Sequence, residues 1–179
     1  WMLKQRWQPD IRTVSPWFDN KNYIKALALT ITKHLKNRSK IDKLVVSFHG
    51  IPKRYFMAGD PYHCHCVKTA RLIKEELKWP EDKFLVTFQS RFGPEPWLQP
   101  YTDKTIIELA KQGSENIAVI APGFISDCLE TLEELNVEAR ELFFENGGKT
   151  FQYIPCLNDN EFSIKFLNQK IKQNLLGWD

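Results

Sequence analysis

Near-continuous apolar runs of strand length are the sequence feature that most constrains this fold. Three of them, at 44–48, 84–88 and 117–121, consist mainly of Leu, Val, Ile, Phe and Ala. A strand that is apolar at nearly every position, rather than at alternate positions, is typical of a parallel sheet that is covered on both faces. Two weaker runs, 11–14 and 151–154, are further strand candidates.

Segments with helical periodicity separate these runs. The expected helices cover residues 21–36, 64–77, 102–112, 127–146 and 162–176. Parallel strands need crossover connections of helix length, so the alternation predicts a Rossmann-like α/β fold with a parallel sheet of four to five strands and helices on both faces. The sequence has no G-x-G-x-x-G, Walker A or G-x-S-x-G pattern, which excludes the common nucleotide-binding and hydrolase versions of such a sheet.

Length and composition limit the remaining choices. The 179 residues fit one domain, which we expect at 10–179, with 1–9 as a linker or helix from a domain that is missing here. The net charge of +3 and the scattered Lys and Arg residues argue against a nucleic-acid partner. Four cysteines without zinc-ribbon spacing, together with no signal-peptide pattern, predict a cytoplasmic protein.

Polar and aromatic groups follow the predicted strands. His49 ends the first run, Gln89 and Ser90 follow the second, and Trp97 lies in the proline-rich loop that comes next. Open α/β sheets bind ligands at the carboxyl ends of their strands. An imidazole there takes a proton or a metal, and an indole offers a flat apolar wall. The pattern predicts a metal-assisted reaction, or the handling of a metal beside an aromatic ligand.

The predicted helix after the third run has one acidic and one apolar face. Its acidic residues are Asp127, Glu130, Glu134, Glu138 and Glu141, and its apolar residues are Leu132, Leu135, Ala139, Leu142 and Phe143. One interpretation is a solvated face that begins with a capping box of Asp127 and Glu130. The other is a face turned towards a ligand, where a cation relieves the repulsion between acids four residues apart.

Several of these candidates have a plain structural alternative. His49 suits a hydrogen-bonded loop histidine, and Trp97 suits packing against its own loop. The sequence His63-Cys64-His65-Cys66 resembles a metal clip, but alternate residues at the start of a helix point in different directions. Metal binding is therefore the less favoured reading of that segment.

Four motifs at the right separations resemble the ferrochelatase family, whose members insert Fe(II) into protoporphyrin IX in the last step of haem synthesis. They are 47–52 (Ser-Phe-His-Gly-Ile-Pro), 59–62 (Gly-Asp-Pro-Tyr), 87–93 with 96–98, and 122–124 with 126–134. The resemblance runs from about Pro9 to Leu157 and is closest to the proteobacterial type. It covers the C-terminal half of such an enzyme, which implies a second α/β domain that closes over the porphyrin.

The resemblance implies a role for each matching residue. His49 handles the pyrrole protons or the metal on one face of the macrocycle, and Glu130 lies across the pocket. Asp127 and Glu134 continue a path for metal or protons along a helix with a π-type distortion. The porphyrin wall comprises Trp97, Gln89, Ser90 and Phe124. Cys128 stands where animal members have a His, and the sequence leaves its role open.

Other expectations concern substrates and partners. Protoporphyrin IX and ferrous iron are the expected substrates, and the N-terminal half is the expected partner, without which the fragment should have little activity. Some members hold a [2Fe-2S] cluster on cysteines of a C-terminal extension; since this chain ends at Asp179 without one, we expect no cluster. Alternatives are a chelatase for another metal and tetrapyrrole, or a tetrapyrrole- or metal-binding module without catalysis. Peripheral contact with a membrane is a further hypothesis.

Overall fold

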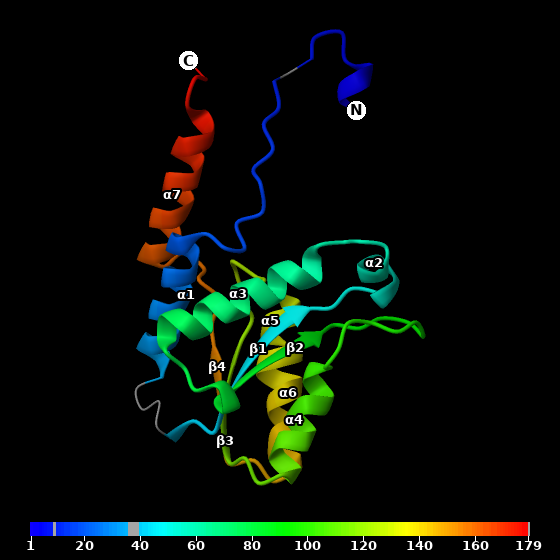
Figure 1. The fold of residues 1–179 in the computed structure, drawn as a ribbon, viewed down its shortest axis with the longest axis vertical. Coiled ribbons are helices and arrows are strands. Elements are labelled where there is room, and N and C mark those ends of the chain that lie inside the picture. Colours follow the sequence, from blue (N-terminus) through cyan, green and yellow to red (C-terminus); the bar gives the residue numbers. More distant parts are fainter. Residues whose placement is uncertain (9, 36–39, 179) are drawn as a thin grey trace.

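A four-stranded parallel sheet forms the centre of the molecule in a computed structural model, which describes residues 1–8, 10–35 and 40–178 (Figure 1). Its strands run in the order β2-β1-β3-β4, and every neighbouring pair is parallel. The strands are β1 (Lys43–His49), β2 (Phe84–Gln89), β3 (Asn116–Ile120) and β4 (Thr150–Ile154). The predicted α/β class is confirmed, with four strands in the described part of the chain.

The helices agree with the predicted segments to within about two residues at most ends. They are α1 (Lys21–His34), α2 (Lys53–Met57), α3 (Tyr62–Leu77), α4 (Thr102–Lys111), α5 (Leu129–Leu132), α6 (Ala139–Glu145) and α7 (Glu161–Leu175), with a π-helical segment, η4 (Glu134–Glu138), between α5 and α6. Short 3-10 turns occur at Met2–Lys4 and Glu81–Lys83. The predicted end of the first helix, Lys36, lies outside the described residues.

Two cores, one on each face of the sheet, account for the apolar runs. Successive strand side chains point to opposite faces. Leu44 and Val46 therefore pack with α1 and α3, whereas Val45 packs with α4 and α6. All three side chains are fully buried. The helices visible on the two sides of the sheet in Figure 1 are these two covering layers.

The predicted fifth strand at 11–14 is wrong. This segment has no regular secondary structure, and both Ile11 and Val14 are exposed, so no burial stabilises an added strand. Instead, the Arg12 guanidinium donates to the carbonyl oxygens of Asn174 and Leu176, at 2.7 and 2.9 Å, near the end of α7. A cation suits the negative end of a helix dipole. The N-terminal arm therefore lies along the distal part of α7 (Figure 1).

Gly148 is required by the packing after α6. Its N–H donates to the Phe143 carbonyl at 2.9 Å, and a Cβ added at Gly148 would lie 2.2 Å from the Phe143 ring, which is fully buried. We expect Gly148→Ala to lower the free energy of unfolding by about 1–3 kcal/mol through overpacking, measured by urea denaturation. Adding Phe143→Leu should restore part of that loss. Equal stabilities of Gly148→Ala and wild type would contradict this packing.

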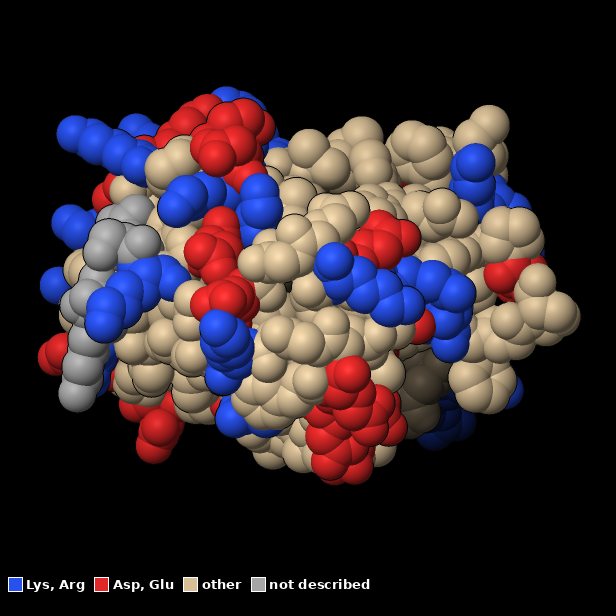
Figure 2. All heavy atoms as spheres, turned by 90° about the horizontal axis from the view of Figure 1, so that it is seen from below, with Lys and Arg blue, Asp and Glu red and all other residues tan. Residues whose placement is uncertain are grey.

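The charged surface is mixed in sign. On the face seen in Figure 2, Lys and Arg side chains are interspersed with Asp and Glu rather than gathered into a continuous basic area. Within the described ranges, no helix combines the length and the apolar character needed to cross a bilayer.

Candidate active site

The carboxyl ends of β1 and β2 bring the first two candidate groups together. His49 is the last residue of β1 and Gln89 the last of β2, and the two are direct partners in the sheet register. The Gly50 N–H donates to the Gln89 carbonyl at 2.7 Å. A Cβ on residue 50 would lie 2.9 Å from that same oxygen, so this close approach of the two backbones requires glycine.

The His49 side chain is oriented by its own loop. Its Nδ1 lies 2.6 Å from the Gly50 carbonyl oxygen. A carbonyl only accepts, so Nδ1 carries the hydrogen and the neutral ring keeps its lone pair on Nε2. The Tyr62 hydroxyl donates to the His49 carbonyl at 2.9 Å and fixes the backbone beneath the ring. His49 is half-buried, and its geometry suits a base or a metal ligand through Nε2.

Two aromatic rings flank His49. The ring centroids of Trp97 and Phe124 each lie 6.4 Å from the centroid of the imidazole, with interplanar angles of 55° and 56°. The Trp97 indole N–H donates to the Phe92 carbonyl at 2.8 Å, and its backbone forms an isolated bridge with Pro52. The proline-rich loop therefore holds Trp97 beside the imidazole, and packing on the loop and lining the site are compatible.

Gln89 connects the sheet to the acidic helix. Its Oε1 accepts from the Ser47 hydroxyl at 2.8 Å, and the Glu130 carbonyl, which can only accept, assigns the amide nitrogen to the other side. Its Nε2 then donates to the Glu130 carbonyl at 2.7 Å and, at 3.3 Å, to the Glu134 carboxylate. The side chain is 96% buried, since only 4% of its surface is exposed. Gln89 thus fixes the distance between the end of β2 and the backbone of Glu130.

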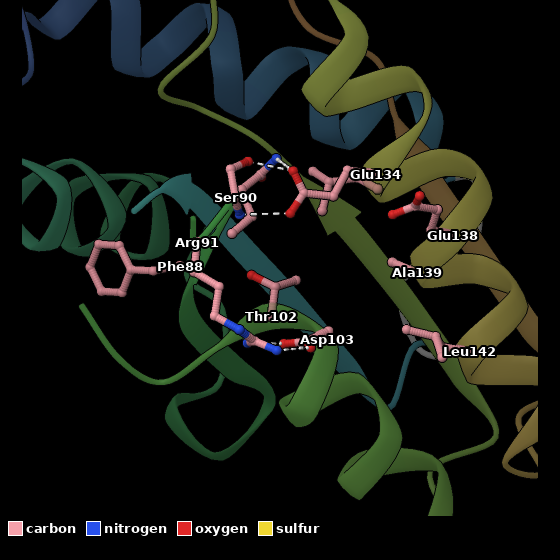
Figure 3. Close-up of a pocket in the computed structure, with 11 residues that line it drawn as sticks. Phe88, Ser90, Arg91, Thr102, Asp103, Glu134, Glu138, Ala139 and Leu142 are labelled. Carbon is pink, nitrogen blue, oxygen red and sulfur yellow. Dashed lines mark hydrogen bonds and ion pairs between the residues drawn. The ribbon is translucent and has the colours of Figure 1, made fainter. Parts of the chain in front are cut away.

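Glu134 is held at the end of β2 by Ser90. Its carboxylate accepts from the Ser90 N–H at 2.6 Å and from the Ser90 hydroxyl (Figure 3). Ser90 has a φ of +62°, a conformation that aims both donors at Glu134. On the other side of a cavity of about 270 Å³, Arg91 forms a two-point ion pair with Asp103, at 2.9 and 2.7 Å. Glu138 and Leu142 also line this cavity.

The acidic helix contains the expected π segment, which changes its buried face. The Glu138 N–H donates to the Glu133 carbonyl, five residues back, at 2.9 Å. Such a turn takes one more residue than an α turn. The buried positions are therefore four apart: Thr131, Leu135, Ala139 and Phe143. The prediction that Leu132 shares the buried face is wrong, since that side chain is 49% exposed.

The start of the acidic helix also differs from the predicted capping box of Asp127 and Glu130. Cys128 is the N-cap, and its N–H donates to the Thr131 hydroxyl at 2.9 Å. The Asp127 carboxylate accepts from the Tyr153 hydroxyl at 2.5 Å and from the Asn158 side-chain amide at 2.7 Å. Burial alone would raise the pKa of Asp127, but these two hydrogen bonds, together with those from Cys156, lower the pKa below its ordinary value.

Glu130 is the candidate acid that interacts electrostatically with His49. A hydrogen bond from the Cys128 thiol is the main cause of a lowered Glu130 pKa, and His49, when protonated, lowers it further. The Cys128 pKa is raised, chiefly by burial and then by the Glu130 carboxylate. Glu130 is therefore ionised at neutral pH, within electrostatic reach of the imidazole. Cys128 serves it as a hydrogen-bond donor.

The structure separates the remaining candidate ligands. The Asp127 carboxylate accepts hydrogen bonds from Tyr153 and Asn158. The Glu134 carboxylate accepts from Ser90 and Gln89 instead. His63 packs between the rings of Phe56 and Phe88, whereas the His65 ring stacks on Phe18 at 3.8 Å. In the part of the chain that the structure describes, no three His, Cys, Asp or Glu side chains are grouped to hold a metal ion. Residues 63–66 therefore agree with the favoured reading of that segment, in which alternate side chains point in different directions.

Fold and site together define a chelatase-type α/β domain. SirB from Bacillus subtilis, solved with Fe3+, has a similar fold: the TM-score is 0.60 at 12% identity, over 87% of this chain and 54% of that one. The family model of ferrochelatase matches residues 1–175, and the chain belongs to the ferrochelatase family.

Curated relatives agree with this assignment. A ferrochelatase of Rhizobium meliloti is 58% identical over 178 residues, which are 99% of this chain and 52% of that protein. A ferrochelatase of Allorhizobium ampelinum is 57% identical over the same shares, and one of Pseudoalteromonas atlantica is 49% identical. The chain spans about half the length of these relatives.

Proposed function

We propose that this chain is the C-terminal half of an enzyme that inserts Fe(II) into protoporphyrin IX to form haem. Membership of the ferrochelatase family supports the reaction class. The observation that carries the proposal is the placement of the His49 imidazole between the rings of Trp97 and Phe124, with the Glu130 carboxylate within electrostatic reach. An aromatic edge with one base and one acid suits a flat macrocycle that exchanges protons for a cation.

Proton removal falls to His49 in this proposal. Insertion of one Fe(II) releases the two pyrrole protons of the free-base porphyrin, so charge balances. The Nε2 lone pair of His49 is the acceptor, since Nδ1 is already engaged with the Gly50 carbonyl. A pKa close to the working pH lets an imidazole take a proton and pass it on. Trp97 and Phe124 keep water from this face of the ring.

Metal delivery falls to Glu130. An ionised carboxylate attracts a divalent cation, and a half-exposed side chain can release it again. Gln89 fixes the Glu130 backbone, and Ser90 fixes Glu134 one turn further along the helix. Glu134 and Glu138 border the adjacent cavity and extend the acidic surface over which iron would approach.

The other half of the enzyme is the partner in this proposal. Large apolar side chains are exposed on the N-terminal arm and on the distal part of α7, which lie next to each other in Figure 1. They comprise Trp1, Leu3, Trp7 and Ile11 on the arm, and Ile171, Leu175, Leu176 and Trp178 at or after the end of α7. An exposed apolar surface of this kind is typical of an interaction site. We place the assembled enzyme in the cytoplasm.

The decisive experiment is a metal-insertion assay with the full-length protein. Fe(II), kept reduced under anaerobic conditions, should convert protoporphyrin IX to haem, and absorbance should follow both species. Zn(II) is a second substrate that needs no reductant. Porphyrin binding without insertion would support a binding module instead. A clear preference for cobalt or nickel and another tetrapyrrole would make the protein a different chelatase.

Replacement of Glu130 tests the metal side of the site. We expect Glu130→Gln in the full-length enzyme to lower kcat by about 10²-fold, the lower end of what a positioned transfer group contributes. The amide keeps the size of the side chain but cannot hold a cation by charge. Porphyrin binding, measured by fluorescence, should stay unchanged. Glu141→Gln, on the exposed side of α6, is the matched control and should keep full activity.

A further inference from the structure

A cluster of four hydrogen-bonded side chains ties the start of the acidic helix to the segment that follows β4. We call Asp127, Thr131, Tyr153 and Asn158 the Asp127 cluster. Asp127 precedes α5 and Thr131 lies within it. Tyr153 and Asn158 follow Asp127 by 26 and 31 residues. The family resemblance implies a path for metal or protons through Asp127 and implies no role for Tyr153 or Asn158.

Both carboxylate oxygens of Asp127 accept from the cluster. Oδ1 accepts from the Tyr153 hydroxyl at 2.5 Å and from the Thr131 hydroxyl at 3.0 Å. Oδ2 accepts from the Asn158 amide at 2.7 Å, while the Asp127 N–H donates back to the Asn158 Oδ1 at 2.8 Å. Asn158 is held in turn, because its N–H donates to the Ile125 carbonyl at 2.8 Å.

These contacts leave little room for a cation at Asp127. The hydrogens of Tyr153, Thr131 and Asn158 point at the carboxylate, and each carries positive partial charge. A metal would have to displace several of them. A carboxylate that accepts two or three hydrogen bonds is a strong structural anchor, because charge-assisted hydrogen bonds are about twice as strong as neutral ones.

The cluster leads directly to Glu130. Thr131 is its sequence neighbour, has no exposed surface, and accepts from the Cys128 N–H. The Cys128 thiol lies close enough to the Glu130 carboxylate to be the main cause of its lowered pKa. On the other side, Gln89 Nε2 holds the Glu130 carbonyl. Glu130 is therefore fixed from two directions, by the Asp127 cluster and by Gln89.

We propose that Asp127, Thr131, Tyr153 and Asn158 are positioning residues that hold Glu130 opposite His49, and that Asp127 does not carry metal. This inference rests on the proposed function of Glu130. A side chain that transfers a cation to a ring centre must be placed to within about 1 Å, and a loosened support costs rate rather than porphyrin binding.

Kinetics of the full-length enzyme distinguish a positioning role from a metal-carrying one. We expect Tyr153→Phe and Thr131→Val each to lower kcat by about tenfold or more, as for residues that orient a reacting group, with unchanged KM for the porphyrin. Thr131→Ser, which keeps the hydroxyl, should retain most activity. If Asp127 carries metal instead, Asp127→Asn should raise the KM for metal while Tyr153→Phe and Thr131→Val behave as wild type. That result would overturn the inference.

A matched control separates local positioning from general loss of stability. Asp42 Oδ2 accepts from the N–H groups of Glu115 and Asn116, at 2.9 and 2.8 Å. This contact lies at the amino ends of β1 and β3, away from the site at the carboxyl ends. Asp42→Asn therefore removes a similar structural carboxylate away from the site. We expect it to lower thermal stability about as much as Asp127→Asn but to keep kcat. An equal fall in kcat in both variants would refute a positioning role.

Amide hydrogen exchange tests the positioning role without measuring activity. The amides of residues 125–131 should exchange faster in Tyr153→Phe and Thr131→Val than in wild type or Asp42→Asn. Unchanged exchange in that segment would overturn the inference, even if the wild-type protein proved not to insert metal. A wild-type protein without insertion activity but with the expected exchange pattern would refute only the proposed function.

Discussion

His49→Ala in the full-length enzyme should lower the rate of metal insertion by about 10³- to 10⁴-fold, towards the upper end of what one acid–base side chain contributes. The imidazole is the group placed to take protons from a ring lying against Trp97 and Phe124. Porphyrin binding should fall much less, because the two aromatic walls remain. Stopped-flow absorbance for insertion and fluorescence quenching for binding measure the two effects separately.

His34→Ala is the matched control for that substitution. His34 is exposed in the last turn of α1, where its Nδ1 lies 2.9 Å from the Thr30 carbonyl oxygen. The control should retain wild-type turnover. Normal turnover in His49→Ala itself would show that another group is the base, and would leave His49 with only the structural role of a loop histidine.

The 179-residue chain by itself should lose most of the rate acceleration, which in enzymes is commonly about 10⁶-fold or more. The described site is a single edge: His49 lies near the rings of Trp97 and Phe124, a planar ring bound there would be contacted from one side only, and Glu130 is partly open to solvent. A macrocycle held on one face keeps most of its freedom to tumble and stays hydrated. The chain also covers only 52% of the Rhizobium meliloti relative.

The activity of the isolated chain should return when the remaining half is supplied. The measurement is zinc insertion by the chain alone, by the full-length protein, and by the chain mixed with the separately produced other half. Circular dichroism should confirm that the isolated chain is folded. Insertion by the chain alone within about tenfold of the full-length rate would show that one edge is sufficient for catalysis.

Local sequence patterns predicted the sheet well because each strand is buried on both faces. The runs in β1, β2 and β3 are apolar at nearly every position, as burial on both faces requires. The segment 11–14 shares only its β-branched residues with them and lies on the surface, where its Arg12 caps α7 about 160 residues away. A contact at that distance leaves no periodic signal, so the pattern predicted a strand in error.

The candidate site could be predicted only in part, because long-range contacts leave no local signal in the sequence. Strand ends and the family resemblance identify His49, Trp97 and Phe124, and the structure brings these three together. Their catalytic roles, and that of Glu130, stay predictions. Tyr153 and Asn158 were missed because each acts through a hydrogen bond to Asp127 that spans more than 25 residues. The local signal was the turn-forming sequence at 158–160, Asn-Asp-Asn. Asn158 has the positive φ, +48°, that Asn tolerates in a turn.

The π segment at Glu134–Glu138 amounts to one extra residue in an otherwise ordinary helix, and the helix would be more regular without it. Deleting a single residue there would rotate everything before it by about 100° relative to α6. Such a deletion should yield a helix with a better hydrogen-bond ladder and a protein that folds, but Glu130 and Glu134 would lose their contacts with Gln89 and Ser90. The irregularity is therefore a local stability cost that keeps Glu130 and Glu134 in contact with Gln89 and Ser90, and a thermostability selection without an activity screen should remove it first.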